Sequence, residues 1–209
     1  MLSANYTSEN ICGALGLDGF ANDWQLAQSD ECIRVLLKPS FHREICISVL
    51  SKEKKVSVVV IAALSQIWLQ DWPVPQLTKV EQDAGSLSEF QFARLSSLLN
   101  AAAAPKQPAR FVILDGMPAY AVLRADREGK LNIDKNVSGD ASYKSFIAEA
   151  ITQAHSATGS PSIRNALADA GSYAGLRIPS EVIPPAKDAV RTLVLGEPGQ
   201  TALLRLLQN

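Results

Sequence analysis

The chain has 209 residues, of which 47% are hydrophobic and 20% are charged, and its formal net charge is -1. These values are typical of a folded globular protein and exclude an intrinsically disordered chain, and the length is sufficient to bury a substantial core. The 20 Lys and Arg residues are scattered along the chain, so a nucleic-acid partner is not expected.

The sequence also indicates a compartment. Residues 1–10 lack the basic start and the apolar stretch of a secretory signal, and the longest apolar run, 56–64, is about half the roughly 20 residues that a membrane-spanning helix needs. We therefore expect a cytoplasmic protein that does not associate with a membrane. The odd number and wide spacing of Cys12, Cys32 and Cys46 favour reduced core thiols over a disulfide framework or a zinc site.

The first half of the chain, 1–104, has the pattern of a β-hairpin followed by a helix. Apolar residues alternate on both sides of a charged turn at 51–55, and prolines break the segment that follows, 67–77. In chain order the predicted elements are a short helix at 9–15, a strand at 32–37, hairpin strands at 45–49 and 56–60, an edge strand at 77–82, and a helix at 87–104 capped by Ser86 or Ser88.

The second half, 109–209, repeats this order of strands followed by a helix. The proline pair Pro105 and Pro108 marks the boundary, and an Asp-Gly turn at 115–116 begins a second β-meander. The predicted elements are strands at 110–114, 119–125 and 130–135, helices at 143–155 and 162–173, a strand at 190–195 and a helix at 201–208. We predict an α+β fold with mostly antiparallel sheet or sheets and helices packed on one face. The two halves pack as one compact unit, and their duplication is left open because their residues do not repeat.

None of the candidate reaction centres is well supported. The segment 194–201 faintly resembles a phosphate-binding loop, but its glycines are too close together and Gln200 stands where a lysine is needed. It is better interpreted as a turn before the helix at 201–208. His42 and Cys46 share a strand face, but four residues along a strand span about 13 Å, too far for a nucleophile and its base.

The remaining ionisable residues also have simpler interpretations. His155 is expected at the carboxyl end of its helix, where the helix dipole favours a positive charge. Asp115, Asp126 and Asp134 lie in one meander and could pair for acid and base work, but the first two fall in or beside turns where Asp bonds locally. No metal site and no cofactor are predicted.

Two tryptophans are the strongest candidates for a binding surface. Trp68 and Trp72 lie in the proline-broken segment, and indoles are enriched among the residues that dominate interface energies. Asp71, Glu81 and Asp83 would form an acidic rim that favours a basic partner. The alternative is that the tryptophans cover an open end of the sheet.

The sequence thus predicts a non-catalytic cytosolic protein that binds another protein. The expected type is a bacterial immunity protein that neutralises a toxin, or a secretion chaperone, in either case by steric cover of a partner surface. The first alternative is a hydrolase-like enzyme whose site is assembled only in three dimensions. The second is a structural homo-oligomer.

Overall fold

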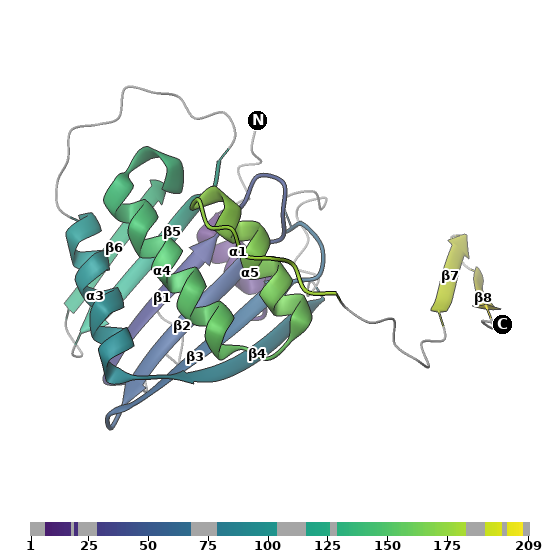
Figure 1. The fold of residues 1–209 in the computed structure, drawn as a ribbon. Helices are drawn as coiled ribbons and strands as arrows, with labels where there is room; N and C mark the ends of the chain where they lie inside the picture. The colour runs from purple at the N-terminus through teal and green to yellow at the C-terminus, as the bar shows by residue number, and fades with distance from the viewer. Residues whose placement is uncertain are drawn as a thin grey trace.

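The computed structural model describes residues 7–17, 19–20, 29–67, 79–103, 116–125, 129–182, 191–197 and 200–206. Its elements, in chain order, are α1 (Ser8–Ala14), β1 (Glu31–Leu37), β2 (Ile45–Lys52), β3 (Lys55–Ala63), β4 (Val80–Leu87), α3 (Glu89–Ala103), β5 (Pro118–Ala125), β6 (Gly129–Asn136), the 3-10 turn η2 (Val137–Gly139), α4 (Ala141–Ala157), α5 (Pro161–Tyr173), β7 (Arg191–Glu197) and β8 (Gln200–Leu206). Six strands form one antiparallel sheet and helices pack on it (Figure 1), so the predicted α+β class is confirmed.

The six-stranded sheet has the order β4-β3-β2-β1-β5-β6. The central strand β1 pairs with β2 on one side and with β5 on the other, so strands from both sides of the Pro105–Pro108 boundary share one sheet. β2 and β3 are joined through Glu53 and Lys54, which both have positive φ, as a type I′ hairpin turn requires. β4 and β6 are the two edge strands of this sheet.

One face of the sheet carries α3, α4 and α5 and contains the larger core. Strands β1, β2 and β3 are rich in β-branched residues. Every second side chain of each points into this core, because successive side chains of a strand alternate between the two faces of the sheet. The residues are Ile33, Val35 and Leu37 of β1, Ile45, Ile47 and Val49 of β2, and Val56, Val58, Val60 and Ala62 of β3. Tyr143 of α4 is fully buried there, and its hydroxyl donates to the carbonyl of Ala119 at 2.8 Å.

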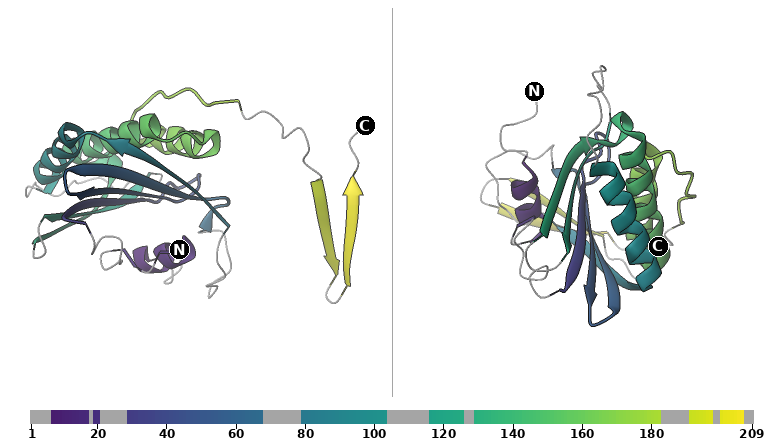
Figure 2. Two further views of the ribbon diagram at one scale, coloured as in Figure 1. Left: turned by 90° about the horizontal axis from the view of Figure 1, so that it is seen from below. Right: turned by 90° about the vertical axis from the view of Figure 1, so that its left-hand side faces the viewer.

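The opposite face carries α1 (Figure 2), which belongs to a second, smaller core. Gly16, with φ +77°, ends this helix, and the chain then brings Phe20 onto the sheet. The Nη1 atom of the fully buried Arg34 donates to the carbonyl of Gly19 at 2.9 Å, and its Nε donates to Ser48 Oγ at 2.9 Å. Among the described residues, α1 and Phe20 cover only part of this face.

Three elements predicted from the sequence differ from the described structure or lie outside it. The helix predicted at 201–208 is wrong, because β8 pairs with β7 in a separate two-stranded sheet. A helix of eight residues forms few hydrogen bonds after its unfavourable nucleation step. A strand that follows a short turn, in contrast, can pair directly with the strand before it. The edge strand expected at 77–82 continues to Leu87, and the strand expected at 110–114 lies outside the described residues.

Candidate functional site

The outer edge of β4 is the candidate site, and its hydrogen-bonding pattern follows from the register. Leu64 N–H donates to the carbonyl of Lys79 at 2.8 Å, one step beyond the Ala63 and Val80 pair. In an antiparallel ladder, hydrogen-bonded and non-hydrogen-bonded pairs alternate. The residues of β4 that bond β3 are thus Glu81, Asp83, Gly85 and Leu87, while those whose backbone groups point away from the sheet are Val80, Gln82, Ala84 and Ser86.

The outward positions of β4 carry only uncharged side chains, and all four are exposed. Edge strands usually avoid unwanted pairing through charged side chains, prolines or bulges. The only hydrogen bond from the described residues to an outward N–H of β4 comes from Asp83 Oδ1, which accepts from Ala84 N at 2.8 Å. In contrast, β6 at the other edge carries the charged Asp134 at a position whose backbone groups point away from β5. β4 is therefore the less protected edge.

Glu81 and Asp83 hold the loop between α4 and α5. Asp83 Oδ2 accepts from the N–H groups of Gly159 and Ser160, each at 2.7 Å, and Glu81 Oε1 accepts from Ser160 Oγ at 2.5 Å. The Ser160 hydroxyl, with that of Ser162, lowers the pKa of Glu81, and the Ser160 N–H lowers that of Asp83. Both carboxylates are half-buried on the helix side of β4.

A close backbone contact completes this junction. A Cβ atom added to Gly85 would lie 2.0 Å from the carbonyl oxygen of Ala157, the last residue of α4. Only glycine lets the two backbones approach so closely. The helix side of β4 is thus covered by the end of α4, while its outer edge and its other face are left for other contacts.

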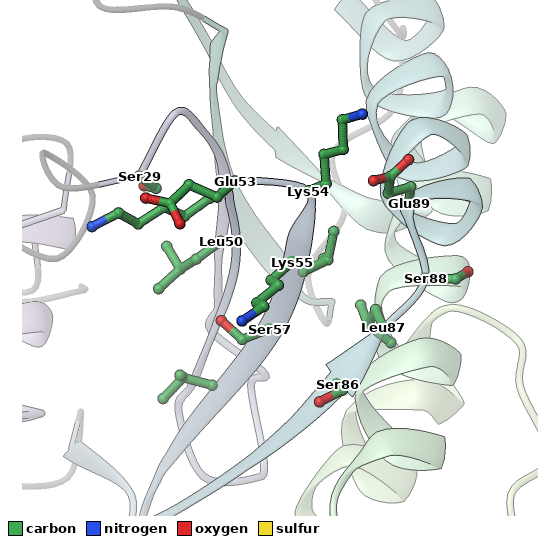
Figure 3. Close-up of a pocket in the computed structure, with 13 residues that line it drawn as sticks. Ser29, Leu50, Glu53, Lys54, Lys55, Ser57, Ser86, Leu87, Ser88 and Glu89 are labelled. Atoms are coloured by element: carbon green, nitrogen blue, oxygen red, sulfur yellow. The ribbon is translucent and has the colours of Figure 1, made fainter.

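Beside β4, on the face that α1 leaves uncovered, the sheet has an open hollow of about 820 Å³ at the β2–β3 turn. Figure 3 shows Lys55 and Ser57 along β3, with Leu50 on one side and Ser86 on the other. Leu50, Ser57 and Ser86 stand in one row across the three strands, and half-buried Val59 follows on the same face. The hollow combines an apolar floor with three lysines, two glutamates and several serine hydroxyls.

The structure describes only part of the predicted binding surface. Trp68, Trp72 and Asp71 lie outside the described residues. Glu81 and Asp83 lie two residues apart on β4, and both accept hydrogen bonds from the loop at Ser160.

The chain that leads into the tryptophan segment is nevertheless fixed at its start. Fully buried Glu44 accepts from Ile67 N–H at 2.7 Å. Nearby, Leu64 is 48% exposed and Val80 is 39% exposed, where β4 begins. The proline-broken segment therefore departs next to exposed apolar side chains.

The other sequence candidates do not assemble into a reaction centre within the described residues. His42 Nδ1 lies 3.1 Å from the hydroxyl of Tyr173, while Cys46 is buried in the smaller core. His155 is in the last turn of α4 as expected, but burial and then Arg164 lower its pKa, which favours the neutral imidazole over a positively charged cap. Asp134 is exposed on β6, and Asp115 and Asp126 are not described.

The described part of the chain contains neither a cluster of metal ligands nor a membrane-spanning helix. No three His, Cys, Asp or Glu side chains gather there as metal ligands would. None of its helices combines the length and apolar character needed to cross a bilayer. The segment 194–201 bridges β7 and β8, and the three cysteines are unbridged and buried.

Two features of the site were missed from the sequence. The first is the link between β4 and Ser160, which lies 77 residues beyond Asp83 and has no local pattern. The second is the open hollow, whose lining brings together Ser29, the β2–β3 turn and the end of β4. The alternation of acidic with uncharged residues from 80 to 84 was the one available signal, since it distinguishes two faces.

The comparisons give no relatives for this arrangement: no protein-family model, curated protein or solved structure matches the chain.

Proposed function

We propose that this chain is a non-catalytic protein that binds an extended segment of another protein along the outer edge of β4. The observation that carries the proposal is the pairing pattern of β4. Gln82 and Ser86 direct their backbone N–H and C=O groups outward, and the side chains at the outward positions are uncharged. An extended segment can add to such an edge through backbone hydrogen bonds, with side chains in alternate pockets supplying specificity.

The hollow beside β4 supports the proposal because it would receive every second side chain of the added segment. Leu50 and Val59 offer an apolar floor, and the side chain of Lys55 lies beside Ser57 in Figure 3. Glu81 and Asp83 are occupied by the Ser160 loop, so they give little reason to expect a basic segment. We expect apolar side chains over the floor and an acidic or polar one near Lys55.

This mode of binding favours one of the two types that the sequence suggests. A toxin-neutralising protein covers a folded surface, whereas a secretion chaperone holds stretches of its partner that are not folded. Addition of a strand to β4 requires an extended stretch, so it agrees better with the secretion-chaperone type. Trp68 and Trp72 remain candidate anchors, since Glu44 fixes the chain just before them.

The decisive experiment uses Gln82→Pro beside Gln82→Ala. The N–H of Gln82 points away from β3, so proline removes one outward donor without a ladder bond, at a cost to folding of no more than about 1 kcal/mol. Both variants and the unaltered chain are used to capture partners from the native cell, and the captured protein is then titrated against each. We expect Gln82→Ala to bind normally and Gln82→Pro to bind about tenfold more weakly, equivalent to about 1.4 kcal/mol.

Amide hydrogen exchange at Ser86 locates the contact. The Ser86 N–H should exchange slowly in the complex, because an added strand would accept its hydrogen bond. Equal affinity of the two Gln82 variants, or rapid exchange of the Ser86 N–H in the complex, would refute strand addition at β4. If the captured protein is a second copy of this chain, the structural homo-oligomer replaces the binding of a different protein.

A further inference from the structure

The segment that follows α5 leaves the folded body beside β4. Glu181 N–H donates to Asn165 Oδ1 at 2.6 Å, and its carbonyl accepts from Asn165 Nδ2 at 2.9 Å. The Glu181 carboxylate also pairs with Arg164 at 2.8 Å. Arg164 and Asn165 lie in the first turns of α5, and its N-cap residue Ser160 donates a hydrogen bond to Glu81 of β4. Residues beyond 182 therefore start close to the Glu81 end of that strand.

Residues 191–206 form a β-hairpin that has no other strand partner among the described residues. β7 and β8 pair with each other across a two-residue turn and constitute their own sheet. An isolated two-stranded hairpin is at best marginally stable in water. The hairpin thus has reason to add to a further strand, and β4 is an edge with outward groups available.

We propose that β8 pairs antiparallel with the outer edge of β4 in the same chain and covers the site until a partner segment displaces it. The pairing of β8 with β4 concerns this chain alone. Its role in controlling access of a partner segment to β4 rests on the proposed function. The extended sheet would have the order β7-β8-β4-β3-β2-β1-β5-β6, antiparallel throughout like the existing one. It would give both the hairpin and β4 the neighbour that each lacks.

Charge supports this direction of pairing. The register puts Arg191 and Arg205 near the open end of the hairpin and Glu197 at its turn. With β8 antiparallel to β4, the open end lies toward Glu81 and the turn lies toward the lysines of the β2–β3 turn. Arg205 of β8 then lies toward the Glu81 end of β4, whereas the reverse direction would bring it toward the lysines of the β2–β3 turn.

The tether is long enough for this contact within one chain. Residues 183–190 can span at most about 28 Å, while β4 itself is about 27 Å long and neighbouring strands are about 5 Å apart. A tether of this length gives an effective concentration of the order of millimolar. Intrachain pairing is therefore favoured over pairing with a second copy at ordinary protein concentrations.

The test compares Leu203→Pro with Leu203→Val in the full chain. Glu197 and Gln200 close the two-residue turn, so alternation directs the Leu203 N–H away from β7. Proline at 203 removes a bond to β4 and leaves the hairpin ladder intact. We expect amide exchange at Gln82 and Ser86 to be at least tenfold faster in Leu203→Pro than in the unaltered chain, and nearly unchanged in Leu203→Val, with α4 amides protected in all three.

Three outcomes would overturn the inference. They are equal exchange rates at Gln82 in all three proteins, a dimer by light scattering that dissociates as Ser86 loses protection, and acceleration by Leu203→Val as large as that by Leu203→Pro.

Partner titration separates this inference from the proposed function. If Gln82→Pro loses the partner while Leu203→Pro leaves exchange unchanged, only the hairpin inference fails. If Leu203→Pro accelerates exchange while Gln82→Pro and Gln82→Ala bind the partner equally well, only the proposed function fails.

Discussion

Substitution of Gly85 by alanine should separate β4 from α4. The added Cβ would lie 2.0 Å from the carbonyl oxygen and 2.7 Å from the carbonyl carbon of Ala157, whereas ordinary contact begins at 3.4 Å. Both obstacles are backbone, so the strand and the helix end must move apart by more than about 1 Å. The hydrogen bonds from Gly159 and Ser160 to Asp83 lie within this junction and would lengthen with it.

The expected cost combines overpacking, at about 1–3 kcal/mol, with partial loss of hydrogen bonds to a charged acceptor, for a total of roughly 2–4 kcal/mol. For a domain of this size, about 1 kcal/mol corresponds to a change in Tm of roughly 2–4 °C, so we expect Gly85→Ala to lower Tm by roughly 5–15 °C. Urea unfolding at constant m-value measures the same loss directly.

Gly13→Ala is the matched control for Gly85→Ala. Gly13 lies inside α1 without a positive φ, and a Cβ there would meet nothing within 4 Å. The same chemical change should therefore be neutral or stabilise by up to about 1 kcal/mol, because alanine restricts the unfolded chain. If Gly85→Ala proved as stable as Gly13→Ala, the close approach of β4 to α4 would be refuted.

Two other properties can be measured with purified protein. The folded-state pKa values of Glu81 and Asp83 are lowered, so their contribution to stability is complete above their unfolded pKa values near 4 and disappears as pH falls through the folded ones. Glu81→Gln with Asp83→Asn should flatten the decline of unfolding free energy below about pH 5 in urea titrations, and an unchanged slope would contradict this assignment. Arg34→Met should cost about 1–3 kcal/mol and expose the chain around Phe20 to limited proteolysis, because the carbonyls of Gly19 and Phe20 lose their donor. Cleavage there at the unaltered rate would show that Arg34 does not hold this segment.

The strands with strong periodicity could be predicted from the sequence, and those without it could not. Val56, Val58 and Val60 recur at every second position, and β-branched residues favour a pleated surface, so β3 was located correctly. The second part of β4 contains Asp83, Ala84, Gly85 and Ser86, all of low strand propensity. Its conformation comes from the ladder with β3 and the contacts with the α4–α5 loop, which are distant in sequence.

The pairing that unites the two halves was equally hidden. β1 and β5 are separated by about 80 residues, and alternation gives the faces of each strand without naming its neighbour. Arg34 shows the same limit at the level of one side chain. A charged residue in a strand is expected to face water, but this guanidinium is buried because the carbonyls of Gly19 and Phe20 and the hydroxyl of Ser48 surround it.

The energetics of the β4 edge place its specificity in the hollow. The N–H and C=O groups of Gln82 and Ser86 offer about four hydrogen bonds to an added strand, worth roughly 2–6 kcal/mol in total. Association itself costs about 4 kcal/mol or more, before the ordering of a flexible segment. Backbone pairing alone therefore gives at most weak binding, and the N–H of Ala84, already bonded to Asp83, reduces it further. Micromolar affinity requires burial of the segment's side chains over Leu50 and Val59. The sequence of a natural partner should therefore be apolar at alternate positions, while the residues between them can vary.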